Sequence, residues 1–243
     1  MSSAGRALAV VQARMSSSRL PGKTLADIEG EPMLALLLRR LASSRGVGEI
    51  VVATSTRSDD DPIARLAPAL GARVSRGSLL DVLSRFAAAV GEHTGPVVRI
   101  TGDCPLLDPA LVDRVLELLA ARPECVYASN IQPRTFPDGL DVEAIDADTL
   151  RALAADRLLS PEQREHVTSA LRAQPQRYPA AALVGELDLG ALRWTVDEAA
   201  DLEFVRALVR RLGPRRHSAG LAELLAAVRR PPSLAGCGGG GRG

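Results

Sequence analysis

The feature that most constrains this chain is a regular alternation of short apolar runs with longer amphipathic ones. Residues 7–13 (ALAVVQA), 49–55 (EIVVATS) and 96–100 (PVVRI) are short and rich in β-branched residues, which is typical of strands buried on both faces. Residues 33–44 and 60–71, which lie between them, carry apolar residues at helical spacing. This order predicts an α/β fold with a mostly parallel, doubly wound sheet and helices on both faces.

The alternation continues to residue 130 and then changes character. We expect a strand at 72–77, a helix within 78–91, a helix at 109–121 and a strand at 125–130. Beyond this point we expect a turn and strand at 135–146, helices at 147–158 and 160–174, strands at 178–185 and 192–196, and helices at 197–213 and 218–230. We therefore expect one domain over residues 1–230 with a β-rich segment at about 130–190. The low-complexity tail, 231–243, is expected to be disordered.

Composition excludes several classes of function. The formal net charge is +1 and aromatic residues make up 2% of the chain, so we expect no nucleic-acid partner. The apolar run near the start is too short to span a membrane, so no membrane association is expected. Three scattered cysteines without a CxxC pair fit a reducing compartment, and we expect a cytoplasmic protein.

The loop after the first strand carries three cations that need an explanation. Residues 10–25 read VVQARMSSSRLPGKTL and include Arg14, Arg19 and Lys23. The ending resembles a phosphate-binding P-loop, but that motif requires a glycine where this chain has Ser17. The simplest alternative is a solvated loop face. Because a serine run and a Pro-Gly pair offer no other reason for three cations, we favour an anion site.

Two carboxylates follow other strands of the predicted sheet. Asp103 comes after the strand at 96–100, and Asp197 follows the segment 192–196. Ligands bind beyond the carboxyl ends of such strands, so these acids are expected to face the cationic loop. Cations opposite carboxylates indicate a polyphosphate with a bound divalent metal, for which Mg²⁺ is the natural ion. The structural alternatives are a helix N-terminal role for Asp103, for which Asp108 is the better cap, and an N-cap role for Asp197.

Three motifs together resemble a known family. Ala13-Arg14 and RLPGK (19–23) resemble the opening signature of the cytidylyltransferases that activate acidic sugars, such as keto-deoxy-octulosonate and acylneuraminate. RITGDCPLLDP (99–109) is similar to that family's Gly-Asp-x-Pro magnesium motif, and TVDEAADLEFV (195–205) to its second metal motif. Within the family, RGSLLDVLSRF, SNIQPRTFPDGLDVE and REHVT most resemble the spore-coat polysaccharide biosynthesis protein F group.

The resemblance implies a Rossmann-like nucleotidyltransferase fold of the GT-A type, with CTP as the nucleotide, Mg²⁺ as the cofactor and a homodimer as the assembly. It implies nucleotide contacts from Ala13, Arg14, Arg19 and Lys23, catalytic roles for Arg14, Lys23 and Asp103, and metal ligation by Asp103 and Asp197. The chain departs from the family pattern after Asp197, where Thr-Pro-Glu-Asp is replaced by Glu-Ala-Ala-Asp. Asp201 retains the second acid, but the proline is lost.

Each of the further candidates has more than one interpretation. Arg76, Asp81 and Arg99 either line the nucleotide pocket or form ion pairs. Asp138, Asp141, Glu143 and His166 are candidates for acceptor binding. Strand alternation puts Asp141 and Glu143 on one face, which either meets the acceptor or faces solvent. For His166 there are three alternatives: it binds an acid group of the acceptor, it helps to remove a proton from the acceptor hydroxyl, or its role is structural.

The expected reaction is transfer of CMP from CTP to a small acidic acceptor, either a sugar acid or a phosphate or phosphonate, with release of pyrophosphate. One alternative is a glycosyltransferase that consumes a nucleotide sugar, although RLPGK suits a triphosphate better than a diphosphate. The other is a catalytically silent nucleotide-binding protein, which the altered residues after Asp197 leave open.

Overall fold

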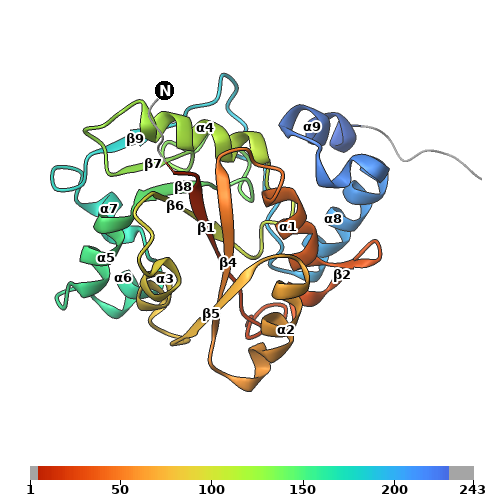
Figure 1. Cartoon of the computed structure of the whole chain (residues 1–243). Coiled ribbons are helices and arrows are strands. Elements are labelled where there is room, and N and C mark those ends of the chain that lie inside the picture. The colour runs from red at the N-terminus through yellow and green to blue at the C-terminus, as the bar shows by residue number, and fades with distance from the viewer. Residues whose placement is uncertain (1–4, 230–243) are drawn as a thin grey trace, which may run out of the picture.

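The centre of the molecule is a seven-stranded mixed sheet. The structure, a computed structural model, describes residues 5–229, so the expected disordered tail lies outside the described residues. The strand order is β5-β4-β1-β6-β8-β7-β9 (Figure 1). The strands are β1 (Ala7–Gln12), β4 (Val47–Ser55), β5 (Arg73–Gly77), β6 (Pro96–Thr101), β7 (Tyr127–Ser129), β8 (Glu143–Asp146) and β9 (Ala180–Ala182). Only β8 runs antiparallel to its neighbours, which confirms the expected mostly parallel sheet.

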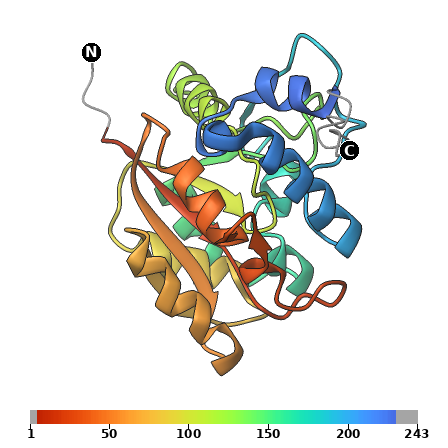
Figure 2. The same ribbon diagram turned by 90° about the vertical axis from the view of Figure 1, so that its right-hand side faces the viewer.

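Helices cover both faces of the sheet because the central strand is apolar on both sides. In β1, Ala9 and Val11 join one buried cluster, while Leu8 and Val10 join the other. The first cluster is completed by α1 (Met33–Leu41), α2 (Asp61–Ala69), α4 (Pro109–Ala120), α8 (Ala199–Leu212) and α9 (Leu221–Arg229). The second face carries α3 (Val82–Val90), α5 (Ala147–Ala155), α6 (Pro161–Glu165) and α7 (Ser169–Ala173). Figure 2 shows α1 and the blue α8 in front of the sheet, on the first face.

Two expected elements are wrong. Residues 192–196 form no strand beyond a single bridge between Asp138 and Arg193, because this segment crosses the carboxyl ends of the strands. The helix expected at 160–174 is two helices, α6 and α7. The chain breaks at Val167, which has a φ of 45° and is fully buried, so it leaves helical geometry to reach the core. The sequence pattern also does not predict the short hairpin of β2 (Asp27–Ile28) and β3 (Glu31–Pro32).

The carboxylate of Asp108 caps α4, as expected, and also holds the last helix. It accepts hydrogen bonds from the backbone of Ala110 at 2.9 Å and of Leu221 at 2.7 Å. The second bond fixes the start of α9 against the start of α4. Within residues 5–229, no helix has both the length and the apolar character that a bilayer crossing requires.

A buried arginine joins α1 to the same region. Arg40 is fully buried and donates to the carbonyls of Leu107 at 2.7 Å, Leu106 at 3.2 Å and Ala219 at 2.5 Å, and to that of Arg216. Burial lowers the pKa of Arg40 to about 10, although nearby carboxylates act against the shift, so the guanidinium remains charged at neutral pH. Four carbonyls from two distant segments therefore depend on one side chain.

We expect Arg40→Met to lower the free energy of unfolding by about 2–4 kcal/mol, because it leaves buried carbonyls without donors. The matched control is Arg39→Met, which removes a half-exposed side chain 3.2 Å from Glu31 and is expected to cost less than about 1 kcal/mol. Urea denaturation of both variants measures the difference. Equal losses in the two variants would contradict a structural role for Arg40.

Candidate functional site

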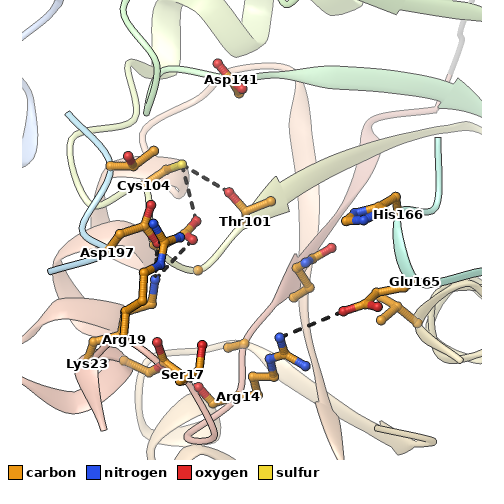
Figure 3. Close-up of a pocket in the computed structure, with 18 of the residues that line it drawn as sticks. Arg14, Ser17, Arg19, Lys23, Thr101, Cys104, Asp141, Glu165, His166 and Asp197 are labelled. Carbon is orange, nitrogen blue, oxygen red and sulfur yellow. Dashed lines mark hydrogen bonds and ion pairs between the residues drawn. The ribbon is translucent and has the colours of Figure 1, made fainter. Parts of the chain in front are cut away.

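A cavity of about 450 Å³ opens at the carboxyl ends of β1 and β6 (Figure 3). This volume lies in the range of small-molecule sites. Among the residues predicted from sequence, the cavity brings together Ala13, Arg14, Arg19, Lys23, Asp103, Asp138, Asp141, His166 and Asp197. In Figure 3, Arg19, Lys23 and Asp197 lie on one wall, and His166 and Glu165 lie on the opposite wall.

The cationic loop is held by its own backbone and by one buried acid. The Thr24 hydroxyl donates to the carbonyl of Arg14 at 2.7 Å, and the Gly22 amide donates to the carbonyl of Met15 at 3.0 Å. Gly22 has a φ of 76°, which glycine adopts without strain. Asp60 accepts from the Met15 amide at 2.7 Å and from the Ser55 amide at 3.1 Å, which ties the loop to the end of β4.

The close approach of β6 to β1 requires a glycine. The Gly102 amide donates to the carbonyl of Gln12 at 2.8 Å. A Cβ atom on Gly102 would lie only 2.8 Å from that same oxygen, so a larger residue would push the strands apart. Asp103 follows directly and is thereby placed at the cavity wall.

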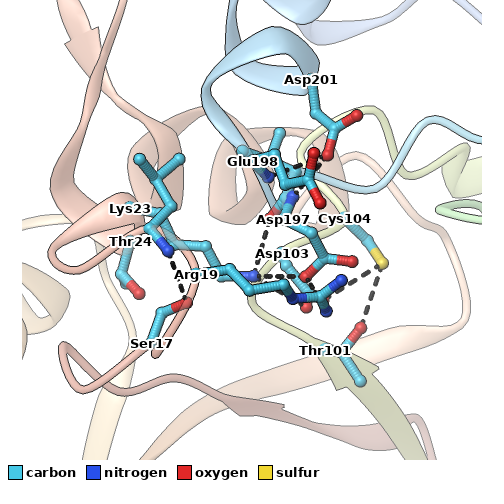
Figure 4. A network of polar contacts seen from close by, with 12 residues as sticks. Ser17, Arg19, Lys23, Thr24, Thr101, Asp103, Cys104, Asp197, Glu198 and Asp201 are labelled. Atoms are coloured by element: carbon cyan, nitrogen blue, oxygen red, sulfur yellow. Dashed lines mark hydrogen bonds and ion pairs between the residues drawn. The ribbon is translucent and has the colours of Figure 1, made fainter.

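The two carboxylates predicted as metal ligands lie side by side. The Val196 amide donates to the Asp103 carbonyl at 2.9 Å, which aligns the two loops. Lys23 Nζ lies 3.2 Å from Asp103 Oδ2, 3.0 Å from Asp197 Oδ1 and 2.6 Å from the carbonyl oxygen of Val196 (Figure 4). Arg19 also reaches Asp197 Oδ1, at 3.0 Å, from a largely exposed position.

Asp197 is not the N-cap of α8. That position belongs to Glu198, which forms a capping box with Asp201. Asp201 Oδ2 accepts hydrogen bonds from the backbone amides of both Asp197 and Glu198 at 2.9 Å. The acid retained from the family motif therefore fixes the backbone that presents Asp197, whose own carboxylate remains turned to the cavity.

Asp103 is ionised at neutral pH despite its burial. Burial raises the pKa of Asp103, but the Lys23 charge and the hydrogen bond from Thr101 outweigh this effect and hold the pKa below its usual value. The neighbouring Cys104 is buried, as is Trp194. Burial raises the pKa of the Cys104 thiol well above its usual value, and the nearby Asp103 charge raises it further, so this thiol stays neutral.

The opposite wall contains an arginine that sequence reasoning missed. Arg85 lines the cavity, is 2% exposed and donates to the carbonyl of Ser78 at 2.5 Å. The signal was present in α3, where Val82, Arg85, Phe86 and Ala89 occupy one helical stripe. An arginine at a buried position of an otherwise apolar stripe indicates that its charged group meets polar groups in the interior, here at the cavity. Arg14 lies 4.0 Å from Glu165 on the same side.

The predicted acceptor side carries an incompletely balanced negative charge. Arg134 binds Asp141 with two hydrogen bonds of 2.8 Å and lies 3.6 Å from Asp138. One guanidinium therefore serves two carboxylates. Burial and the neighbouring Asp141 charge raise the pKa of Asp138, against the opposite effect of Arg134.

Two of the open candidates form ion pairs away from the cavity wall. Arg76 lies 2.7 Å from Asp61 and donates to backbone carbonyls of Ser55 and Arg57. Asp81 caps α3 and lies 3.1 Å from Arg164. Both side chains stabilise the local structure around α2 and α3. Of the two interpretations, lining the nucleotide pocket or forming ion pairs, the structure favours ion pairs.

Arg99 and Glu143 form a buried pair beneath the cavity. Arg99 binds Glu143 and donates to Gln12 Oε1 at 3.1 Å, while the Tyr127 hydroxyl donates to Glu143 at 2.5 Å. Glu143 begins β8, whereas Asp141 precedes the strand, so the two acids do not line one cavity face as strand alternation predicts. Burial raises the pKa of Glu143, but Arg99 and the hydrogen bonds from Thr168 and Tyr127 hold it below its usual value.

We expect Glu143→Gln to destabilise the fold by about 3 kcal/mol at pH 7, because it leaves Arg99 buried without its counter-charge. The folded pKa of Glu143 lies below its unfolded value of about 4.3, so its contribution is complete above that pH and is lost as the pH falls through the folded pKa. Denaturation of wild type and variant between pH 3 and 7 tests this. The gap between them should be constant above about pH 5 and narrow in more acidic solution. A gap that widens on acidification would refute the assignment.

The donor set at Asp103 and Asp197 fits a magnesium ion. Mg²⁺ prefers oxygen ligands and is commonly held by one or two carboxylates together with substrate phosphates and water. Two carboxylates and a backbone carbonyl already converge on one cationic nitrogen at this point. In residues 5–229, no three His, Cys, Asp or Glu side chains are grouped so as to hold a metal ion by themselves. A metal here would take its remaining ligands from a bound nucleotide.

Comparison with known proteins gives a consistent result. A sequence model of the cytidylyltransferase family matches residues 8–208. The chain is 31% identical over 237 residues to the spore coat polysaccharide biosynthesis protein SpsF of Bacillus subtilis (strain 168), covering 94% of this chain and 96% of that protein. It is 40% identical over 120 residues to a 3-deoxy-manno-octulosonate cytidylyltransferase of Geobacter sulfurreducens, covering 47% and 46%. A cytidylyltransferase structure from Leptospira borgpetersenii superposes with a TM-score of 0.86 at 27% identity, covering 92% and 94%.

Proposed function

The chain belongs to the cytidylyltransferase family, and from this premise we propose that it transfers CMP from CTP to a small acidic acceptor and releases pyrophosphate. This membership confirms two expectations from the sequence, the family resemblance of the motifs and the nucleotidyltransferase fold. The observation that carries the proposal is the cavity geometry, in which Arg14, Arg19 and Lys23 face Asp103 and Asp197. Cations suit the phosphates, and carboxylates suit the metal that accompanies them.

In the proposed step, an oxygen of the acceptor attacks the α-phosphorus of CTP. The bond between the α-phosphorus and the oxygen that bridges to the β-phosphorus breaks, and pyrophosphate leaves with that electron pair. The protein has little covalent work to do, so its contribution is positioning and charge stabilisation. We assign Arg14 and Lys23 to the β- and γ-phosphates, Arg19 to a supporting contact, and the Ala13 region to the nucleotide.

We assign Asp103 and Asp197 as the residues that would hold Mg²⁺. When bound, the ion neutralises phosphate charge and stabilises the departing pyrophosphate. Asp103 is prepared for this role because its pKa is held low, so the carboxylate is available without a proton loss at neutral pH. Asp201 positions Asp197 through its backbone amide.

We place the acceptor against Asp138, Asp141 and His166. Where the nucleophile is a hydroxyl, His166 is the group that we assign to take its proton; a phosphate or phosphonate oxygen needs no such base. The Geobacter relative is named for an acidic sugar, which supports an acidic acceptor. Glu143 and Arg99 act from below the cavity as positioning residues.

We also propose that the protein works in the cytoplasm as a homodimer of one nucleotidyltransferase domain. The segment at about 130–190, expected to be β-rich but built of two short strands and three helices, supplies the proposed contact. Its strand β9 is an outermost strand of the sheet and is followed by the exposed apolar side chains of Val184 and Leu187. Light scattering on the purified protein should give twice the chain mass of 25.6 kDa. Leu187→Asp should shift the mass toward the monomer, and a monomeric wild type would overturn this assignment.

The first test is pyrophosphate release from CTP, UTP, GTP and ATP with Mg²⁺ and a panel of sugar acids, sugar phosphates and phosphonates. We expect release with CTP and one acceptor, and a loss of at least 100-fold in Asp103→Asn because the carboxylate assigned to hold Mg²⁺ is removed. Asp61→Asn is the matched control, since it removes an equal charge outside the cavity, and its rate is expected to change less than about twofold.

Other outcomes identify the alternatives. Consumption of a nucleotide sugar without use of a triphosphate would indicate a glycosyltransferase. CTP binding without pyrophosphate release across the panel would favour a silent nucleotide-binding protein. Absence of binding by any triphosphate would refute the assignment of the cationic loop.

A further inference from the structure

The cationic loop contains a residue that the chain uses nowhere else. Of the 30 lysine and arginine residues in the sequence, Lys23 is the only lysine. Apart from the contact of His217 with Glu31, the surface ion pairs of the described residues are made by arginine, as in Arg73 with Glu49 and Arg210 with Glu29. A compact ammonium on a flexible stem is therefore used at one point, inside the cavity.

In this structure, the Lys23 ammonium lies between the two carboxylates that we assign to the metal ion. It is nearly buried, with 11% of its side chain exposed, and three oxygens surround it at 2.6–3.2 Å. An ammonium has three donors, and Asp103, Asp197 and the Val196 carbonyl use all of them. Lys23 cannot hold phosphate oxygens while it makes these contacts.

The charge balance of this cluster depends on the nucleotide. Asp103 and Asp197 carry two negative charges, and Lys23 and Arg19 carry two positive charges within 3.2 Å of them. Arg193 lies 3.6 Å from Asp197, and its charge is balanced by its ion pair with Asp201. A divalent ion added to this neutral cluster would meet two cations, and like charges at such distances repel strongly in a partly buried site. A triphosphate supplies the negative charge that draws Lys23 away and the oxygens that complete a metal's coordination.

We propose that Lys23 is the resident cation of the metal position and leaves it for the phosphates when CTP binds, so that the two carboxylates accept a divalent ion only together with the nucleotide. The inference rests on the proposed function. It explains why the described residues provide only two carboxylates and no three-ligand group for the ion.

The local structure permits this movement without disturbing the fold. The backbone of Lys23 is held at the start of the 3-10 helix η1 (Lys23–Leu25), where its amide donates to Leu20 and its carbonyl accepts from Ala26. The side chain is bound only by contacts that a phosphate oxygen can replace. Arginine would not serve, because its planar fork cannot occupy a point between three convergent oxygens.

The first experiment measures Mn²⁺ binding by electron paramagnetic resonance, with and without a non-hydrolysable CTP analogue. Without nucleotide, we expect Lys23→Met to bind Mn²⁺ at least tenfold more tightly than the wild type, because the competing cation is gone. With the analogue, the wild type should gain at least tenfold, and the variant much less. Arg39→Met, which removes a cation outside the cavity, should behave as the wild type.

A second experiment follows wild-type Lys23 directly, so it does not depend on a variant that folds. Because the chain has one lysine, growth on ¹³C-lysine gives one lysine side chain to observe by NMR. Its ε-methylene signal should shift with the CTP analogue alone, and stay in place with Mg²⁺ alone.

The outcomes separate this inference from the proposed function. Equal Mn²⁺ affinity of wild type and Lys23→Met without nucleotide, or a lysine signal that responds to Mg²⁺ alone, would overturn the exchange. Calorimetry with the CTP analogue provides the independent check. If the analogue fails to bind at all, the proposed function is wrong and this inference falls with it; if it binds but leaves the lysine signal unmoved, only the exchange is wrong.

Discussion

The charged residues of the cavity depend on a single backbone hydrogen bond that holds two loops together. The Val196 amide meets the carbonyl of Asp103 and brings together two loops that are far apart in the sequence. With the two loops held in this way, Lys23 contacts both carboxylates and the Val196 carbonyl. Gly102 and Asp201 support it from either side, the first through a close approach to β1 and the second through the backbone of Asp197. Main-chain contacts thus set the positions of the charged side chains in the site.

The sequence predicts well those features that arise from local patterns. The strands β1, β4 and β6 were visible as short β-branched runs, and the polar residues after them marked the edge where the cavity lies. Parallel strands align their carboxyl ends, so Arg14 and Asp103 were expected near each other although many residues separate them. The cap at Asp108 was predicted for the same reason, since capping depends on adjacent residues.

Features that depend on tertiary contacts were not predictable. Asp60 was interpreted as part of a helix start, whereas its carboxylate holds the backbone of a distant loop. Arg85 belongs to the apolar stripe of α3 by position, and the carbonyl of Ser78 and the cavity, both formed by the tertiary fold, account for its presence there. Residues 192–196 have the apolar composition of a strand, and Trp194 and Val196 are indeed buried. They are buried, however, in a loop that crosses the ends of the strands. Composition reports that a residue is buried, not which neighbour buries it.

The antiparallel strand β8 has a consequence for how the chain folds. In the sheet, β8 lies between β6 and β7, yet β7 is synthesised first. The four parallel strands from β5 to β6 can assemble as soon as the first hundred or so residues are available. β7 must then wait without a partner until β8 arrives to bridge it to β6. Nascent chains that end between these two strands would therefore carry β7 without its neighbour in the sheet, and such an unpaired strand is open to pairing with other chains.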